Sequence, residues 1–147
     1  MRVARDLDLE MPPGELWTVL WDVPRMVTCV PGCVDALELE PHRRYRAHMA
    51  QRVGPIALAV ALEVTISEAD PPRHLRLEAK GRDGALGASV ALSMSLDLVP
   101  REAGSRLRIE TQGRILGKLG ALGHGVIQRK AEELVQEFGM RLRQAVA

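Results

Sequence analysis

The sequence predicts an α+β grip architecture, in which a curved antiparallel sheet of about seven strands wraps around one long C-terminal helix. The first observation is the proline-free stretch 116–147, where apolar residues recur at steps of three and four and so share one helical face. The second is a series of alternating apolar and polar segments joined by short turns, which is typical of antiparallel strands with one dry face. Because a long helix is stable mainly through burial of one stripe, that dry face is its expected partner.

The first expected strand covers residues 3–11 and ends at the Pro-Pro-Gly run 12–14. Two short helices should follow: one over 15–21, and one that starts after Asp22, whose side chain can accept a hydrogen bond at the N-cap. Pro31–Gly32 is a turn signal. The six strands expected after it are 33–39, 44–53, 58–66, 75–80, 86–98 and 107–115. The connections expected between them include turns at 54–55, 70–72 and 81–84 and a loop at 100–105.

The last predicted helix opens with a glycine-rich segment, 117–125. Glycine costs about 1 kcal/mol relative to alanine within a helix, so this segment is expected to be irregular or mobile. Two interpretations remain open: a loosely wound helix start that packs closely on the sheet, or a mobile lip over a pocket. The candidate gate residues of such a lip are Gly117, Gly120, Gly123 and His124.

Composition excludes several functional classes. The net charge is +1 and aromatic residues make up 3% of the 147 residues, so we expect no nucleic-acid partner. No stretch has the length and apolarity of a membrane span, and charged residues interrupt the N-terminus where a signal peptide would be apolar. We therefore expect one domain over residues 1–147, located in the cytoplasm, with contact to the inner face of the membrane left open.

No catalytic or metal-ligating constellation is evident. Three histidines lie in or beside basic, outward-facing segments and are expected to be solvated: His42, His48 and His74. His124 has no identified carboxylate partner, which makes it a weak acid–base candidate. Cys29 and Cys33 could form a redox pair or half a zinc site, but the favoured interpretation is that both pack as small apolar groups around a turn. We assign no catalytic residue and no metal site.

The predicted fold implies a cavity, because a sheet curved around a helix cannot close flush everywhere. The inward faces carry aliphatic and methionine side chains, which suit a flexible apolar ligand held by a few polar groups. Gln51, Thr111 and Arg5 are the polar exceptions on these faces. Access is expected past the glycine-rich segment and the helix at 26–30. The predicted ligand-binding residues are Met26, Val30, Tyr45, Met49, Gln51, Leu77, Met94, Thr111, Leu119, Leu122 and Val126.

The opposite, polar face of the sheet is rich in arginine and allows two interpretations. It could dock onto an acidic partner or onto anionic headgroups. The favoured interpretation is a cross-strand charge ladder, in which Asp6, Asp8 and Glu10 on the first strand face Arg106 and Arg108 on the last.

Several short strings, in this order, resemble those of the START-like (SRPBCC, Bet v 1-type helix-grip) superfamily. They more closely resemble the CoxG family, which is named for a subunit of carbon monoxide dehydrogenase. The strings are CVPGC at 29–33, VGPI at 53–56, the Asp70–Pro71–Pro72 turn and LGKLGALGHG at 116–125, with Trp17, Asp22 and Phe138. The resemblance implies a helix-grip fold with a hydrophobic cavity. The matching strings are turns and the glycine-rich segment, so the resemblance assigns no catalytic residue to this chain. It also implies association with a molybdenum-containing carbon monoxide dehydrogenase or related hydroxylase.

Proposed roles of that family are binding of an isoprenoid quinone as electron acceptor and recruitment of the enzyme to the membrane. Longer members carry a C-terminal extension that reaches the membrane; because this sequence ends at Ala147, we do not expect anchoring of that kind. The leading hypothesis is a non-enzymatic accessory protein that holds a quinone or lipid-like molecule. Two alternatives remain: a polyketide cyclase- or hydratase-like enzyme of the same superfamily, and a protein–protein adaptor that uses the arginine-rich face.

Overall fold

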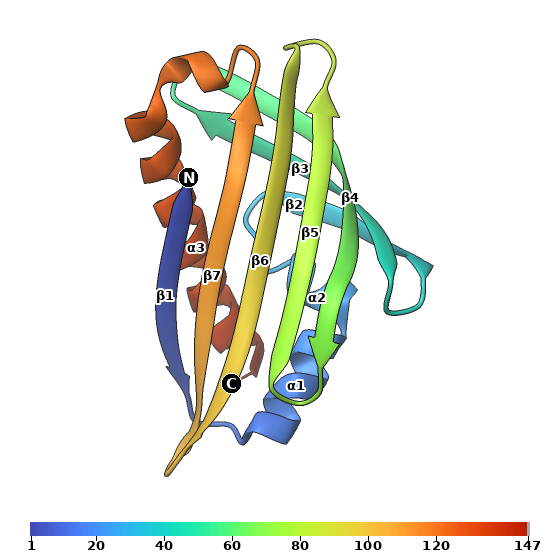
Figure 1. The fold of residues 1–147 in the computed structure, drawn as a ribbon, viewed down its shortest axis with the longest axis vertical. Coiled ribbons are helices and arrows are strands. Elements are labelled where there is room, and N and C mark those ends of the chain that lie inside the picture. Colours follow the sequence, from blue (N-terminus) through green and yellow to red (C-terminus); the bar gives the residue numbers. More distant parts are fainter. Residues whose placement is uncertain (147) are drawn as a thin grey trace.

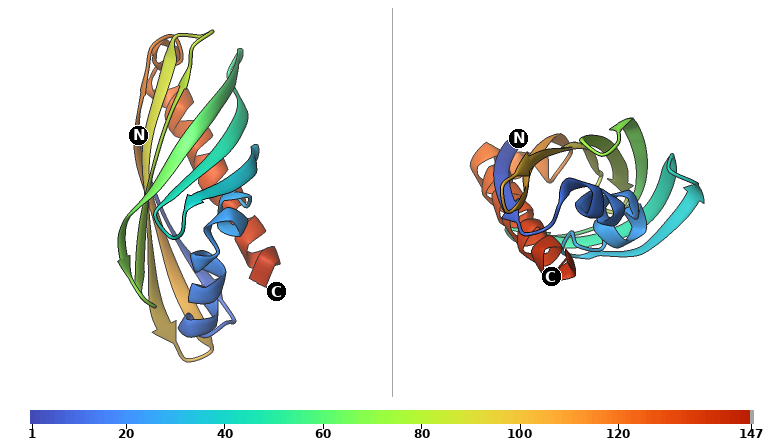
Figure 2. Two further views of the ribbon diagram at one scale, coloured as in Figure 1. Left: turned by 90° about the vertical axis from the view of Figure 1, so that its right-hand side faces the viewer. Right: turned by 90° about the horizontal axis from the view of Figure 1, so that it is seen from below.

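The computed structural model describes residues 1–146 and confirms the α+β helix-grip fold. One antiparallel sheet contains all seven strands in the order β1-β7-β6-β5-β4-β3-β2 (Figure 1). A side view and a view from below show the sheet curving, with α3 and the two short helices on its concave side (Figure 2). In chain order the elements are β1 (Arg2–Leu9), α1 (Pro13–Trp21), α2 (Val23–Val27), β2 (Cys33–Glu40), β3 (Arg44–Val53), β4 (Ile56–Asp70), β5 (His74–Asp83), β6 (Ala88–Arg101), β7 (Gly104–Leu116), the 3-10 turn η1 (Gly120–Leu122) and α3 (His124–Val146).

The predicted alternation of buried and exposed residues is confirmed along the central strands. On β3, Tyr45, Ala47 and Met49 are buried and their neighbours are exposed, and β4 shows the same pattern from Leu58 to Val64. The helix stripe is also confirmed, because α3 buries residues at helical spacing toward the sheet: Ala131, Val135, Phe138, Gly139 and Leu142. The core therefore lies between the concave sheet face and α3. In the described residues no helix has both the length and the apolarity to cross a membrane.

The first strand and the last strand pair along their length, and the predicted charge ladder joins them. Asp8 aligns with Arg106 and Asp6 with Arg108, with nitrogen–oxygen distances of 3.0 and 3.2 Å. Glu10, the third acid expected in the ladder, does not take part, because β1 ends at Leu9. Hydrogen bonds from Arg106 and then Arg101 lower the pKa of Asp8. Because these pairs are exposed, they contribute little stability and serve mainly to fix the register.

The long helix begins later than its apolar pattern predicts. The stretch 116–147 was expected to be helical from its start, but β7 continues to Leu116 and α3 begins only at His124. Gly117 and Gly123 adopt φ of 85° and 94°, a backbone region that no α-helix uses. The segment between them forms a short 3-10 turn, so the glycines terminate a strand and precede the helix.

Several other boundaries differ from the sequence-based expectation. The expected loop at 100–105 is a tight hairpin, since β6 and β7 stay paired as far as Arg101 and Gly104. The expected turn at 81–84 lies later, because β5 runs to Asp83. The helix expected at 26–30 is α2, which ends at Val27, although Asp22 caps it as predicted by accepting a hydrogen bond from the Arg25 amide at 3.5 Å. Arg5 is exposed on the edge strand β1 and does not enter the core.

A candidate ligand-binding cavity

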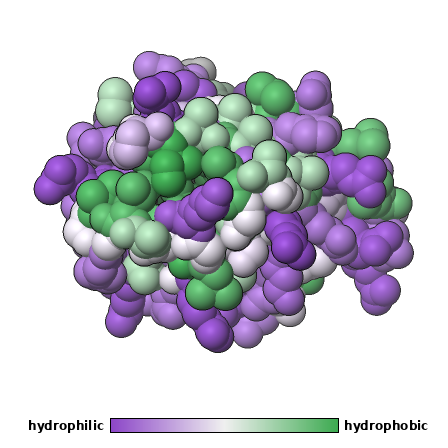
Figure 3. Space-filling model, turned by 90° about the horizontal axis from the view of Figure 1, so that it is seen from above, coloured by the Kyte–Doolittle hydropathy of each residue, from purple (hydrophilic) through white to green (hydrophobic). Residues whose placement is uncertain are grey.

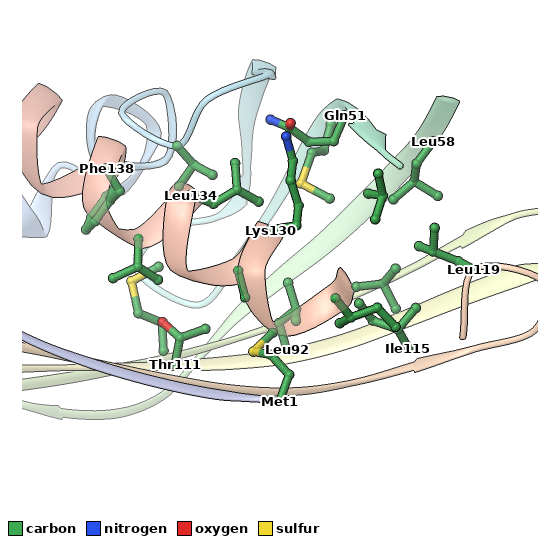
Figure 4. Close-up of a pocket in the computed structure, with 18 of the residues that line it drawn as sticks. Met1, Gln51, Leu58, Leu92, Thr111, Ile115, Leu119, Lys130, Leu134 and Phe138 are labelled. Carbon is green, nitrogen blue, oxygen red and sulfur yellow. The ribbon is translucent and has the colours of Figure 1, made fainter. Parts of the chain in front are cut away.

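Two adjoining cavities lie between α3 and the sheet. The larger measures about 120 Å³ and the smaller, toward α2, about 100 Å³. Five residues border both of them: Val30, Met49, Leu92, Met94 and Thr111. Figure 4 shows how α3 places Lys130, Leu134 and Phe138 on one side of the larger cavity. Leu92 and Met94 point inward yet are only half-buried, because their side chains border this open space.

Three polar side chains border the larger cavity, and they differ in how their polar atoms are paired. Gln51 donates its side-chain amide to the carbonyl oxygen of Pro31, which holds it against the turn before β2. Lys130 comes from α3, and Figure 4 shows its side chain pointing toward that of Gln51. Thr111, on β7, is 8% exposed, and its Oγ1 has no hydrogen-bond partner within the described residues. A buried hydroxyl left unpaired costs about 1–3 kcal/mol, so Thr111 is the natural anchor for a polar atom of a ligand.

Of the eleven predicted ligand-binding residues, the structure brings eight together around the cavities. They are Met26, Val30, Met49, Gln51, Leu77, Met94, Thr111 and Leu119. The other three lie elsewhere in the described structure. Tyr45 is buried in the core, where its hydroxyl accepts a hydrogen bond from the His42 amide at 3.0 Å. Leu122 and Val126 are half-buried outside the cavity walls, against the turn between β3 and β4.

The predicted gate residues lie beside the cavity wall and do not form it. Gly117, Gly120 and Gly123 follow β7, and His124 is the exposed first residue of α3. From this segment only Leu119 reaches the larger cavity, where it is fully buried. Leu119 therefore separates the cavity from this end of the molecule.

Sequence reasoning missed the part of the wall that α3 supplies. Ile127, Ala131 and Leu134 belong to the predicted helix stripe, which on its own indicates plain core. Lys130, a charged residue of the same helix, is half-buried along the cavity. The alkyl stem of lysine can cover apolar surface while its ammonium reaches water, and a polarity pattern does not register that behaviour.

Two of the histidines expected to be solvated have specific partners. His74 lies between two carboxylates on the outer sheet face, with Nδ1 2.6 Å from Asp97 and Nε2 2.8 Å from Glu68. The hydrogen bond with Glu68, and then that with Asp97, raises the pKa of His74 against the opposing effect of burial. His42 stacks on Trp21, with ring centroids 4.1 Å apart. The described residues contain no group of three or more side chains placed to hold a metal ion.

Cys29 and Cys33 are both buried and free, in agreement with the favoured interpretation of the CVPGC string. Burial raises the pKa of both thiols, and that of Cys33 reaches about 11. Cys33 borders the smaller cavity as an uncharged, weakly polar group.

A curved antiparallel sheet that grips a helix around apolar cavities defines a START-like helix-grip protein. The sequence profile of the CoxG family, named for a subunit of carbon monoxide dehydrogenase, matches residues 6–147. The chain belongs to this family. No curated protein matches the sequence significantly.

Solved structures of low sequence identity share the fold. A conserved protein from Geobacillus kaustophilus superposes with a TM-score of 0.84 at 19% identity, over 99% of this chain and 93% of that chain. A protein from Chromobacterium violaceum superposes with a TM-score of 0.70 at 17% identity, over 99% of this chain and 96% of that chain. At such identities the likeness extends to the fold alone.

Proposed function

We propose that this protein is a non-enzymatic binding module that holds part of a hydrophobic molecule, an isoprenoid quinone or a lipid-like compound, between its sheet and α3. The observation that carries the proposal is an apolar cavity pair with an unpaired hydroxyl, Thr111 Oγ1, where the two cavities meet. Membership in a family named for a subunit of carbon monoxide dehydrogenase supports an accessory role beside such an oxidoreductase. In that role the protein would deliver an electron acceptor or recruit the enzyme to the membrane.

The energetic cost of the open space supports an occupant. An enclosed apolar cavity costs about 24 cal/mol per Å³, so open space of about 120 and 100 Å³ destabilises the empty protein by at most roughly 5 kcal/mol in total. Apolar cavities of this kind stay dry and take up small apolar molecules such as benzene. A ligand that fills them recovers part of this free energy on binding.

The size of the cavities limits what lies inside. Pockets for whole drug-sized ligands measure roughly 300–1,000 Å³. A cavity of about 150 Å³ takes up benzene. The two adjoining cavities, of about 120 and 100 Å³, together exceed that size, which suits one ring or a short apolar chain segment. We therefore place the ring of the ligand inside, with a carbonyl oxygen accepting a hydrogen bond from Thr111, and the tail leaving past Lys130 and Gln51.

A matched pair of small probes tests this arrangement. Duroquinone and durene share a six-membered carbon ring with four methyl groups, but only duroquinone carries carbonyl oxygens. Binding of each is measured by calorimetry and by native mass spectrometry, with the wild type and with Thr111→Val, which keeps the side-chain shape and removes the hydroxyl. Because one neutral hydrogen bond contributes about 1 kcal/mol, the preference for duroquinone over durene should fall about fivefold in Thr111→Val.

Two controls separate a lost hydrogen bond from a damaged fold. Thr111→Ser keeps the hydroxyl and should retain the wild-type preference. The empty Thr111→Val protein should be at least as stable as the wild type, because its unpaired buried hydroxyl is gone. If neither probe binds the wild type, the binding function is refuted. If both probes bind and Thr111→Val leaves the ratio of their affinities unchanged, the binding function is supported but the anchoring role of Thr111 is refuted.

A further inference from the structure

Three loops meet at the end of the molecule seen in Figure 3, and we call this surface the glycine end. It consists of residues 53–56, between β3 and β4, residues 84–87, between β5 and β6, and residues 116–126, between β7 and α3. Gly117 packs against the backbone of Gly87, so that the segment after β7 touches the β5–β6 turn. On its other side, Leu122 and Val126 would lie 3.8 Å from a Cβ added at Gly54. The three loops therefore form one continuous surface.

Apolar side chains gather on the glycine end. Leu116 is 60% exposed, more than any other large apolar side chain of the described residues. Pro55, Ala85 and Ala121 are exposed as well, and Leu86 is half-buried. Figure 3 shows a hydrophobic area on this end of the molecule, with one hydrophilic group within it and hydrophilic side chains around it. Soluble proteins rarely expose a connected apolar patch that serves no interaction.

The border of this area is basic and its charges are unpaired. It carries five exposed side chains: Arg52, Arg82, Arg114, Lys118 and Arg129. None of these five forms an ion pair within residues 1–146, whereas the arginines of the β1–β7 ladder do. With these border residues included, the three loops span residues 52–56, 82–87 and 114–129, where the one acid is Asp83, which is buried and accepts hydrogen bonds from the amides of Ala59 and Leu86. Five basic residues and one acid give residues 52–56, 82–87 and 114–129 a net charge of +4. The whole chain carries +1, so its remaining residues carry −3.

We propose that the glycine end docks onto a lipid bilayer that contains anionic headgroups. Leu116 and its apolar neighbours would enter the boundary between headgroups and acyl chains, and the basic border would contact phosphate groups. A surface with an apolar centre and a basic rim matches both layers of such a bilayer. The opposite charge of the remaining chain orients the molecule, because only one end is attracted to the anionic surface.

The glycine end is also the end toward which the larger cavity extends. Leu119 lies on the same loop as Leu116 and separates the cavity from this surface, and Val53 and Ile115 line the cavity just below it. If the proposed function holds, a docked molecule would have its cavity next to the acyl chains, where a hydrophobic ligand resides. Docking itself depends only on the surface and needs no ligand.

Vesicle flotation tests the docking, with neutral phosphatidylcholine vesicles compared with vesicles in which part of the lipid is phosphatidylglycerol. The wild type should bind the anionic vesicles at low ionic strength and be released as salt is added. Each basic side chain near the surface contributes about fivefold to partitioning, so Lys118→Glu should weaken binding at least fivefold. Leu116→Ser should weaken it too, through loss of apolar contact.

Matched variants keep the result interpretable. Arg43→Glu reverses an exposed charge in the β2–β3 turn, outside the glycine end, and should bind as the wild type does. Thr111→Val, which alters only the cavity, should also dock normally, so that failure of docking and failure of ligand binding remain distinct. Equal unfolding midpoints would show that Lys118→Glu and Leu116→Ser are folded.

Three outcomes would overturn the proposal. The first is no binding to anionic vesicles at low ionic strength. The second is equal loss of binding in Arg43→Glu and Lys118→Glu, which would indicate attraction by overall charge alone. The third is binding of the glycine end to an acidic protein surface without binding to vesicles, which would assign this end to a protein partner.

Discussion

Filling the larger cavity should stabilise the protein and abolish ligand uptake. Ala131 is the position of choice, because it lies on the inner face of α3, is 7% exposed and borders the cavity. Ala131→Leu adds three carbon atoms that would extend into the open space. At about 0.8 kcal/mol per buried carbon, the free energy of unfolding should rise by roughly 2 kcal/mol. For a chain of this size that corresponds to an increase in Tm of roughly 4–8 °C.

The assay combines urea unfolding of the empty protein with calorimetric titration of duroquinone. Gln136→Leu is the matched control, since it introduces the same residue on the exposed side of the same helix. It should change stability by no more than about 0.5 kcal/mol and leave uptake intact. If Ala131→Leu instead destabilises the protein by about 1–3 kcal/mol, as overpacking does, the cavity is not open in solution and our reasoning fails. A stabilised Ala131→Leu protein that still takes up duroquinone would place the binding site elsewhere.

Two further predictions concern groups outside the binding proposal. His74 has a raised pKa, so its carboxylate partners stabilise the folded state fully below the unfolded pKa of about 6.5, and this contribution is lost as the pH rises through the folded pKa. The stability difference between the wild type and His74→Gln, measured by urea unfolding, should therefore shrink as the pH rises, and a difference that grows would contradict the assignment. Cys33, with a pKa of about 11, should react with a thiol reagent at mildly alkaline pH at least roughly a hundredfold more slowly than free cysteine until the protein unfolds. Fast reaction in the native state would show that this thiol is accessible.

The sheet was predictable because its signals are local. Alternation of apolar and polar residues determined the inner face of β3 and β4, and a single residue, Asp22, marked the start of α2. The pairing of the first and last strands followed from opposite charges, since Asp6 and Arg108 lie at matching positions on strands with one wet face. Each of these inferences needs only the period of two and the chemistry of a few side chains.

The start of α3 was not predictable from the same kind of pattern. Leu119, Leu122 and Val126 also recur at steps of three and four, and no proline interrupts the segment, so periodicity alone extends the helix too far back into the glycine-rich segment. The backbone of Gly117 decides the outcome, because its positive φ turns the chain as β7 ends. A glycine permits that conformation but does not require it, and the close approach of the Gly87 backbone is visible only in three dimensions.

The environment of His74 depends on a bulge that alternation cannot reveal. Strict alternation along β4 would place Glu68 on the inner face with Ile66. The β4–β5 register shifts between these two residues, so Glu68 instead pairs with Arg76 on the outer face. Its carboxylate can then reach His74, which also faces Asp97 directly across β5 and β6. An extra residue in one strand moves every later side chain to the opposite face.

The cavity combines two defects that a protein selected only for stability would lack. Its open volume costs up to several kcal/mol, and the unpaired hydroxyl of Thr111 adds about 1–3 kcal/mol at the same place. Simple substitutions would remove both, since Ala131→Leu fills the space and Thr111→Val removes the hydroxyl. Stabilising substitutions of this kind are easy to find, and their usual cost is loss of function where a site has to remain less stable. In a binding site, both changes would raise the free energy of unfolding of the empty protein and lower its affinity for the ligand. In a core that is merely packed imperfectly, they would raise the free energy of unfolding and there would be no ligand affinity to lose.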